Sequence, residues 1–413
     1  MKNNRYFCKT EPVYMKRFLL LLFLLTGWAV SAQENQNIEI QHVRYKCYPY
    51  LQHVTETSFT VIWTTNMDAV SWVEIAPDDG THFYNEVRPK YYDLRGLGRR
   101  PIGRLHKVRV TGLEPGTTYR YRIMMQGVLN ADNRKSIVYT EGYGMDILHH
   151  KPTKVTTLKK DYDHLKFAVV NDMHEHDSVL RADFKDARGK YDFVLFNGDM
   201  TSSIDKEEDV VTNYLSSAGE LFAAETPLYI VRGNHEFRGN DALKWYDYMD
   251  NPGGKTYYTF KYGKFFFIVL DSGEDKPDSD IRNLGIMAVE PYVREEAEWL
   301  KEVVRSEDFL NAETRIVFSH IPPGPKGWHG NRMVSELFVP ILNEAGIDLM
   351  LCAHIHKHRV DPIGTTDARF PVVCNRNQTL LECDLDARRL KMDFYDENQK
   401  IWKTLTYKVG SFK

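Results

Sequence analysis

Side chains that can bind metal ions follow five apolar segments of this chain. The segment FAVV, residues 167–170, reads as a buried strand, and the polar residues Asn-Asp-Met-His-Glu-His come directly after it. Four later apolar segments also end in aspartate, asparagine or histidine. One such end is usually an ordinary loop, but five in one chain exceed what surface loops produce by chance. The candidate residues are Asp172, His174, Asp199, Asn234, His235, His320, His354 and His356.

The residue types indicate which metals such a site would hold. Mixed imidazole and carboxylate groups suit Mn, Fe or Zn better than Mg or Ca, which prefer shells made of oxygen alone. The five segment ends therefore predict a transition-metal site, provided that the fold brings them to one place.

From about residue 160 onward, strand-like and helical sequence patterns alternate, and the elements they predict would hold the candidate residues. Apolar strand-like runs such as YDFVLF and TRIVFSH alternate with amphipathic helical stretches near residues 178–189, 207–223, 294–305 and 333–345. This alternation is typical of layered α/β folds, in which ligands gather beyond the strand ends. After Phe370 the helical patterns stop and strand patterns return. We therefore expect mixed sheets packed as a β-sandwich with helices on its outer faces.

The preceding part of the chain, up to residue 157, has a different pattern. In SFTVIWTT the side chains of Phe59, Val61 and Trp63 fall on one face, which is the period-2 signature of a half-buried strand. Further alternating runs are separated by turn residues, and no helical pattern is convincing. An antiparallel β-sandwich is therefore predicted here, as a spacer or packing module without chemistry of its own.

The order of the metal-binding motifs resembles that of the calcineurin-like metallophosphoesterases, which is D-x-H, G-D, G-N-H, H and G-H-x-H. The runs PYLQ and GLEPGTTYRYR are similar to the N-terminal domain of purple acid phosphatases, a fibronectin type III-like sandwich. The resemblance implies a sandwich over residues 33–157 and a four-layer αββα metallophosphoesterase domain over residues 158–413.

The resemblance also implies a role for each candidate residue. It implies two divalent transition-metal ions a few ångströms apart, which would act together on phosphorus and lower the pKa of a bound water to near neutrality. Asp199 would bridge these two ions. His235 would face the substrate as general acid or as a stabiliser of developing charge. The implied reaction is hydrolysis of phosphate mono- or diesters by attack of a metal-bound hydroxide on phosphorus. The alternative is a catalytically silent phosphate-ligand binding protein on the same fold. Asp172, His174 and His356 would hold the first ion, and Asn234, His320 and His354 the second.

Three positions depart from the patterns of these relatives. Ser202 stands where purple acid phosphatases have a metal-binding tyrosine and where many other relatives have a carboxylate that orients the G-N-H histidine. His174 is present although purple acid phosphatases lack it, and Ala353 replaces the first glycine of G-H-x-H. A violet iron–tyrosinate colour is therefore not expected. The loop Pro322–Arg332 is either a lip of the substrate site or an ordinary surface connection.

The N-terminal residues predict export. Met15-Lys16-Arg17 precedes the short apolar run Phe18–Leu25, and the small residues of Val30-Ser31-Ala32 follow before Gln33. We interpret residues 1–32 as a signal peptide with an upstream extension, which places the protein in the periplasm or outside the cell. The alternative is that this segment is retained as an uncleaved anchor, and no membrane-spanning segment is expected beyond it.

The net charge limits the class of partner, and the cysteine spacing limits the kinds of metal or redox site. A net charge of −3 over 413 residues gives no footprint for nucleic acid, so we expect a small phosphate ester as the partner. The four cysteines beyond the signal segment lack the C-x-x-C spacing of zinc or redox sites. Disulfide pairs and buried free thiols are both open on the sequence alone.

Overall fold

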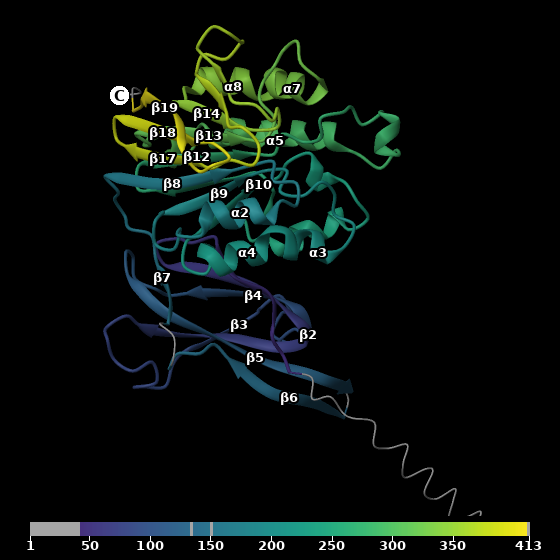
Figure 1. Cartoon of the computed structure of the whole chain (residues 1–413), viewed down its shortest axis with the longest axis vertical. Helices are drawn as coiled ribbons and strands as arrows, with labels where there is room; N and C mark the ends of the chain where they lie inside the picture. The colour runs from purple at the N-terminus through teal and green to yellow at the C-terminus, as the bar shows by residue number, and fades with distance from the viewer. Residues whose placement is uncertain (1–41, 133–134, 149–151, 411–413) are drawn as a thin grey trace, which may run out of the picture. The chain divides into compact units, whose positions relative to one another are not determined.

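The computed structural model describes residues 42–132, 135–148 and 152–410 (Figure 1). Residues from Val43 to Lys413 group into one compact unit. The predicted signal peptide, residues 1–32, lies outside the described residues, and the domain boundary at residue 158 stays a prediction. Among the described residues, no helix combines the length and the apolar character that a bilayer crossing needs.

The N-terminal part is a sandwich-like arrangement of seven strands, in which the long strand β2 pairs with four others and β5 pairs with β6 and β7. The first part of β2 pairs with β1 and β4, whereas its last part pairs with β3 and β5. Phe59, Val61 and Trp63 are fully buried, as the alternation predicted. Thr60, Ile62 and Thr64 on the opposite face are buried as well, so the prediction of a half-buried strand is wrong for that face. The strands are β1 (Tyr45–Gln52), β2 (Ser58–Pro77), β3 (Lys90–Tyr92), β4 (Gly103–Thr111), β5 (Thr118–Asp132), β6 (Ser136–Gly144) and β7 (Thr153–Thr156).

Two six-stranded sheets follow, and both are mixed. The first runs in the order β10 (Leu228–Val231), β9 (Phe193–Asn197), β8 (His164–Val170), β17 (Leu381–Asp386), β18 (Arg389–Tyr395), β19 (Ile401–Lys408). The second runs in the order β11 (Tyr258–Tyr262), β12 (Phe265–Leu270), β13 (Thr314–Ser319), β14 (Leu349–Cys352), β16 (Val372–Cys374), β15 (Arg359–Asp361). Strands β8, β9 and β10 are parallel, and so are β12, β13, β14 and β16. The remaining strands, β17 to β19 in the first sheet and β11 and β15 in the second, pair antiparallel with their neighbours.

Helices occupy the stretches where the sequence predicts them, with shifted ends. The stretch 207–223 is helical throughout but alternates between α and π turns. The last predicted helix, near residues 333–345, also contains both kinds of turn. On the first sheet's side the helices are α2 (Asp177–Phe184), α3 (Glu207–Val210), η1 (Val211–Leu215), α4 (Ser216–Ala218) and η2 (Gly219–Ala223). On the second sheet's side they are α5 (Val289–Val303), α6 (Glu307–Leu310), α7 (His329–Met333), η7 (Val334–Phe338) and α8 (Val339–Ala345). Short 3-10 turns are η3 (His235–Phe237), η4 (Ala242–Tyr248), η5 (Pro252–Gly254) and η6 (Ile281–Asn283).

Three apolar layers hold these elements together, which confirms the predicted αββα order. Between the sheets, Phe167 stacks on Phe193 with ring centroids 4.6 Å apart and meets Phe267 and Phe318 edge-on. A second layer joins the first sheet to α2 and the helices of residues 207–223, and a third joins the second sheet to α5, α7 and α8 (Figure 1). The core therefore fixes both sheets, so their strand ends form a rigid frame.

The four cysteines of the described chain are buried and unpaired. Of the two states left open by the sequence, the structure has the free thiols. Burial raises the pKa of the Cys383 thiol well above its usual range, which disfavours the reactive thiolate.

Candidate metal centre

The carboxyl ends of five strands bring the candidate residues together. Parallel strands β8, β9 and β10 are neighbours in the first sheet, and parallel strands β13 and β14 are neighbours in the second. Because parallel strands end at the same edge, the residues that follow them meet there. After β8 come Asp172 and His174, after β9 Asp199, after β10 Asn234 and His235, after β13 His320, and after β14 His354 and His356.

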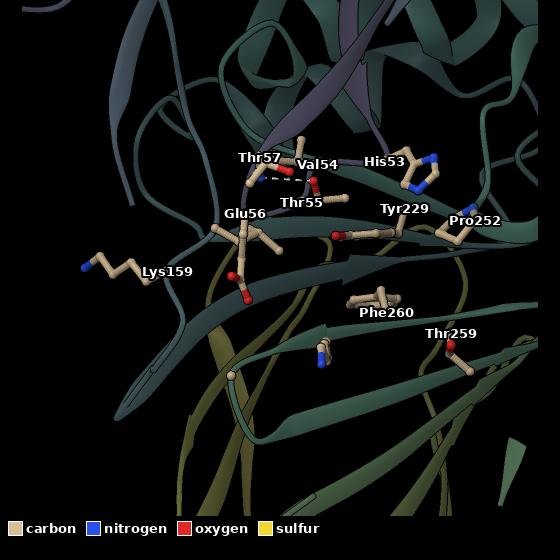
Figure 2. A pocket seen from close by; sticks show the side chains of 13 residues that line it. His53, Val54, Thr55, Glu56, Thr57, Lys159, Tyr229, Pro252, Thr259 and Phe260 are labelled. Atoms are coloured by element: carbon tan, nitrogen blue, oxygen red, sulfur yellow. Dashed lines mark hydrogen bonds between the residues drawn. The ribbon is translucent and has the colours of Figure 1, made fainter. Parts of the chain in front are cut away.

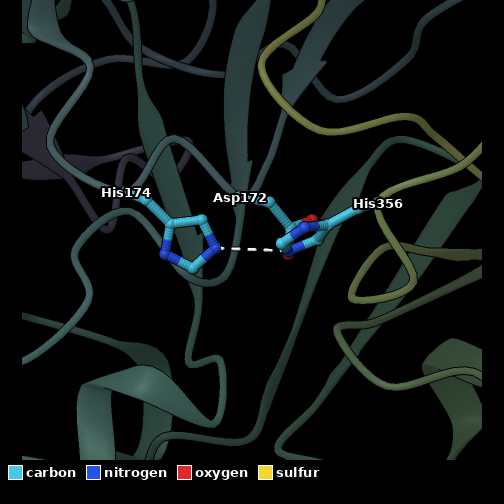
Figure 3. Close-up of side chains that lie close together, drawn as sticks. All are labelled: Asp172, His174 and His356. Carbon is cyan, nitrogen blue, oxygen red and sulfur yellow. Dashed lines mark hydrogen bonds and ion pairs between the residues drawn. The ribbon is translucent and has the colours of Figure 1, made fainter.

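The first cluster consists of Asp172, His174 and His356 (Figure 3). One potential ligand atom of each lies within 4.8 Å of the other two. The Nε2 atoms of the two histidines are 3.3 Å apart, and His356 Nε2 is 3.2 Å from Asp172 Oδ1. Two ring nitrogens and a carboxylate oxygen thus converge on one point, and this is the set that the resemblance implied for the first ion.

The second cluster consists of Asp199, His320 and His354, with the same spacing of potential ligand atoms. Asp199 also belongs to a third group with His174 and His235, so its carboxylate lies between the first two clusters. Asn234 is buried, and its Oδ1 has no hydrogen-bond partner in the described chain. These positions agree with the implied arrangement, whereas the role of each residue as a ligand stays a proposal.

The hydrogen bonds of these residues fit a metal ion. His320 Nδ1 donates to the carbonyl oxygen of Asn197 at 2.8 Å, so the ring's lone pair is on Nε2. That Nε2 faces Asp199 Oδ2 at 3.0 Å, and two acceptors at this distance need a cation or a proton between them. Asp172 Oδ1 and His320 Nε2 are buried without a hydrogen bond among the described residues, although each faces another potential ligand atom at 3.2 Å and 3.0 Å. Buried polar atoms are nearly always satisfied, and a carbonyl that orients a ligating histidine is the usual outer partner of a metal site.

The charges of the centre favour a bound cation. Burial alone would lower the pKa of His320, but Asp199 and Asp172 raise it to about 10. Burial would likewise raise the pKa of Asp199, yet His320 holds it well below its usual range. His354 behaves differently, because burial and the neighbouring His320 lower its pKa to about 4 and leave its ring neutral. Carboxylates next to a neutral imidazole make the centre attractive to divalent cations.

The backbone at the centre is strained in a way that aims side chains inward. Asp172, Asp199, His354 and His356 have φ values of 49°, 53°, 69° and 53°, in the left-handed region. Such conformations cluster at functional sites because the surrounding structure must enforce them. Gly198 explains the glycine of the G-D motif, since its φ is 85° and an added Cβ would lie 2.4 Å from His320 Nδ1.

Two protein-family models match the sequence of this chain. The model for calcineurin-like phosphoesterases matches residues 165–358, and the model for the purple acid phosphatase N-terminal domain matches residues 47–140. The chain contains a calcineurin-like phosphoesterase domain and a purple acid phosphatase N-terminal domain.

This phosphoesterase is homologous to purple acid phosphatases. It is 22% identical over 387 residues to purple acid phosphatase 21 of Arabidopsis thaliana. The alignment covers 83% of this chain and 75% of that protein. Among solved structures, purple acid phosphatase PPD1 from yellow lupin (Lupinus luteus) seeds gives a TM-score of 0.59 at 14% identity, covering 87% of this chain and 74% of that chain. PhoD gives a TM-score of 0.55 at 12% identity, covering 88% and 90%. These structures establish the fold, and the homologues mark the chain as a metal-dependent phosphoesterase of a family that uses a binuclear metal centre.

The positions that depart from the relatives have clear environments in this phosphoesterase. Ser202 Oγ lies 3.4 Å from His174 Nδ1, and its backbone carbonyl accepts a hydrogen bond from His235 Nδ1 at 2.7 Å. A backbone carbonyl thus contacts the G-N-H histidine, where many relatives use a carboxylate. The backbone of Ala353 stays outside the left-handed region, so its methyl group causes no strain there.

Sequence reasoning missed the role of Glu236, which stands directly after the G-N-H motif. Its buried carboxyl group accepts hydrogen bonds from the backbone N–H groups of Asp199, Met200 and Gly233, at 2.8 to 3.0 Å. Glu236 therefore joins the loops after β9 and β10 and holds the central aspartate in place. The adjacent motif could have drawn attention to it, but two of its three partners, Met200 and Asp199, lie 36 and 37 residues away in the chain.

Several residues left unassigned by the sequence lie beside the centre. Glu175 Oε2 accepts a hydrogen bond from Ser202 Oγ at 2.8 Å, and His358 is 2.9 Å from Lys403 Nζ. Both therefore have protein partners outside the metal clusters. In the loop Pro322–Arg332, Trp328 is 70% exposed. Its role at the substrate lip stays a prediction.

A separate cavity of about 360 Å³ lies at the edges of the two sheets (Figure 2). Its floor is formed by Tyr229 of β10 and Phe260 of β11, whose rings stack 3.8 Å apart. The candidate metal ligands are absent from its lining residues. Tyr229 stands near the start of β10, whereas Asn234 follows its end, so this cavity is distinct from the metal centre.

Proposed function

We propose that this chain is an exported phosphoesterase that hydrolyses small phosphate mono- or diesters. The observation that carries the proposal is the convergence of potential ligand atoms on two clusters with Asp199 between them, where Asp172 Oδ1 and His320 Nε2 are buried without a hydrogen bond in the described chain. Two bound transition-metal ions would supply Lewis acidity and an activated water for displacement at phosphorus. The ions would be held by Asp172, His174, Asp199, Asn234, His320, His354 and His356.

The protein's own part is to hold these atoms in place and to receive the phosphoryl group. Asp172 Oδ2 accepts hydrogen bonds from Asn171 Nδ2 at 2.7 Å and from the His354 backbone N–H at 3.1 Å, which leaves Oδ1 for a metal. His235 is half-buried at the mouth of the centre, and its backbone N–H donates to Asp199 Oδ1 at 2.9 Å. The His235 ring therefore stands next to the position that a substrate would occupy.

Metal analysis combined with an ester panel tests this proposal. We expect about two transition-metal ions per chain and hydrolysis of nitrophenyl phosphate esters by the loaded protein. Asp199→Ala should lose both ions, because its carboxylate lies between the clusters, whereas Asp186→Ala on the exposed surface should keep both. One ion or none in active protein would refute the binuclear scheme. Two ions without hydrolysis of any ester would favour the catalytically silent binding protein.

Export rests on the sequence of residues 1–32 alone. We expect the mature protein to begin near Gln33, since a short apolar run followed by small residues is typical of a cleaved signal. Peptide mapping of exported protein checks this start. Recovery of residues before Phe18 from exported protein would show that the segment is retained.

A further inference from the structure

Arg238 lies beside the metal centre and has been given no role so far. It follows the 3-10 turn η3, three residues after His235. Its Nη1 is 2.9 Å from His235 Nε2, and the His235 ring in turn packs against His174 with ring centroids 4.8 Å apart. The guanidinium group is thus one hydrogen bond away from the residue that faces the substrate.

The inner edge of the guanidinium group is fixed by two buried carboxylates. Arg238 Nη2 donates to Glu274 Oε1 at 2.9 Å and Nε donates to Glu274 Oε2 at 3.1 Å, a bidentate pair. Nη2 also lies 3.3 Å from Asp275 Oδ1. The side chain of Glu274 is only 1% exposed and that of Asp275 7%, whereas the side chain of Arg238 is 29% exposed. Planar two-point pairing of this kind holds an arginine in one orientation.

The acidic pair is itself held rigidly. The backbone N–H of Gly330 donates to the carbonyl oxygen of Asp275 at 3.3 Å, and a Cβ on Gly330 would lie 3.1 Å from Asp275 Cα. The loop after β13 therefore packs closely against the loop after β12. Arg238 is anchored by elements of the second sheet while it reaches residues that follow the first.

A count of donors shows what remains for a ligand. An arginine has five N–H donors. Glu274 and Asp275 engage those on Nε and Nη2, and both contacts of Nη1 within the described chain are to the ring nitrogens of His235. Because His235 Nδ1 donates its own hydrogen to the carbonyl oxygen of Ser202, only Nε2 can accept from Nη1, and the other Nη1–H of this partly exposed side chain remains available.

We propose that Arg238 is a substrate-binding residue that donates a hydrogen bond to a phosphoryl oxygen and so selects phosphate monoesters over diesters. A monoester has three non-bridging oxygens and a diester has two, so an additional fixed donor benefits the monoester more. Arginine suits this task because its planar group stays charged and binds phosphate oxygens with defined geometry. This inference rests on the proposed phosphoesterase function.

Two esters with the same leaving group test the selection. With 4-nitrophenyl phosphate, we expect Arg238→Gln to lower kcat/KM by about 10- to 100-fold, the range of one charge-assisted hydrogen bond. With bis(4-nitrophenyl) phosphate, the loss should be less than about 3-fold. Arg238→Lys should recover part of the monoester activity, since the charge is kept and the two-point anchor is lost. Equal losses on both esters would overturn the proposal.

Inorganic phosphate supplies a readout that does not depend on turnover. Calorimetric titration of the metal-loaded protein should show about 10-fold weaker phosphate binding in Arg238→Gln than in the wild type. Unchanged phosphate affinity would overturn the role of Arg238. If the wild type hydrolyses neither ester, the phosphoesterase function fails, while the phosphate titration still decides whether Arg238 binds phosphate.

A matched arginine controls for effects on the fold. Arg95 also makes a two-point pair, with Asp93 in the N-terminal sandwich at 2.6 to 3.0 Å. We expect Arg95→Gln to leave both the monoester-to-diester ratio and the phosphate affinity unchanged. A shift of that ratio in Arg95→Gln as large as in Arg238→Gln would show that the effect is not local, and would also overturn the proposal.

Discussion

His235 shows how the contacts of a single ring restrict its chemistry. A backbone carbonyl only accepts hydrogen bonds, so the contact of Nδ1 with the carbonyl oxygen of Ser202 places the ring hydrogen on Nδ1. A guanidinium only donates, so the contact of Nε2 with Arg238 makes Nε2 an acceptor. In this arrangement Nε2 has no proton to give to a leaving group. Nε2 also has no hydrogen to donate to a phosphoryl oxygen, so the ring can stabilise developing charge only indirectly, by orienting the Arg238 guanidinium group that it contacts.

The prediction that follows concerns leaving groups. His235→Asn should lose similar factors of kcat/KM on an alkyl phosphate and on 4-nitrophenyl phosphate, because no proton is transferred to the leaving oxygen. The loss on each is expected at about 10²- to 10³-fold, the usual cost of removing one group that supports charge stabilisation in the transition state. The variant should retain both metal ions by elemental analysis. A much larger loss on the alkyl ester would restore the general-acid role.

The elements that carry the site also contain a buried ionisable group outside it. Asp183 lies on α2, where its Oδ1 accepts a hydrogen bond from Gln399 Nε2 at 3.1 Å and its Oδ2 is buried without a partner in the described chain. Burial raises the pKa of Asp183 to about 7. The neutral carboxyl group is therefore the form that suits this position in the folded helix.

This group should make the folded state less stable as the pH rises. The folded-state pKa is higher than the unfolded value of about 4, so the folded protein binds the proton more tightly. The contribution to stability is complete below about pH 4 and is lost as the pH rises through about 7. Asp183→Asn should remove this decline and stabilise the protein at pH 8 by about 1 to 4 kcal/mol.

Chemical denaturation between pH 4 and 8 measures this effect. Asp186→Asn is the matched control, because Asp186 is exposed on the same segment and should leave the decline unchanged. Parallel pH profiles for the wild type and Asp183→Asn would show that Asp183 is ionised without cost.

At the scale of the whole molecule, strands of the N-terminal sandwich bond directly to the elements beneath the first sheet. Tyr121 of β5 donates its hydroxyl hydrogen to the carbonyl oxygen of Ala224 at 2.6 Å, and Tyr50 of β1 donates to that of Tyr248 at 2.7 Å. Both hydrogen bonds are buried. The packing therefore couples the stability of the sandwich to that of the phosphoesterase sheets.

We accordingly expect one cooperative unfolding transition for residues 43–410. Tyr121→Phe leaves the buried carbonyl of Ala224 unpaired, which should cost about 1 to 3 kcal/mol. Scanning calorimetry should show the entire transition shifted down by a few degrees, whereas Tyr139→Phe on exposed β6 should shift it little. A separate early transition in Tyr121→Phe would mean that the sandwich unfolds independently.

The alternation of strands and helices and the candidate ligands could be predicted from the sequence, because each depends on residues that are neighbours in the chain. A buried strand is apolar along its length, and the polar residues that follow Val170, Phe196 and Val231 mark where parallel strands leave the core. The resemblance then placed Asp199 between two sets of ligands, and the structure has it there.

The folded structure was needed to identify the side chains that hold site residues in place without being metal ligands themselves. Arg238 follows β10 in the first sheet and Glu274 follows β12 in the second, and 36 residues separate them. Their pairing depends on how two sheets pack across a core of stacked aromatic rings, which no local pattern encodes. The same holds for Glu236, whose carboxyl group is neither a ligand nor exposed but ties together two backbone loops. Residues that position others are recognised by their partners, and those partners are neighbours only after the chain has folded.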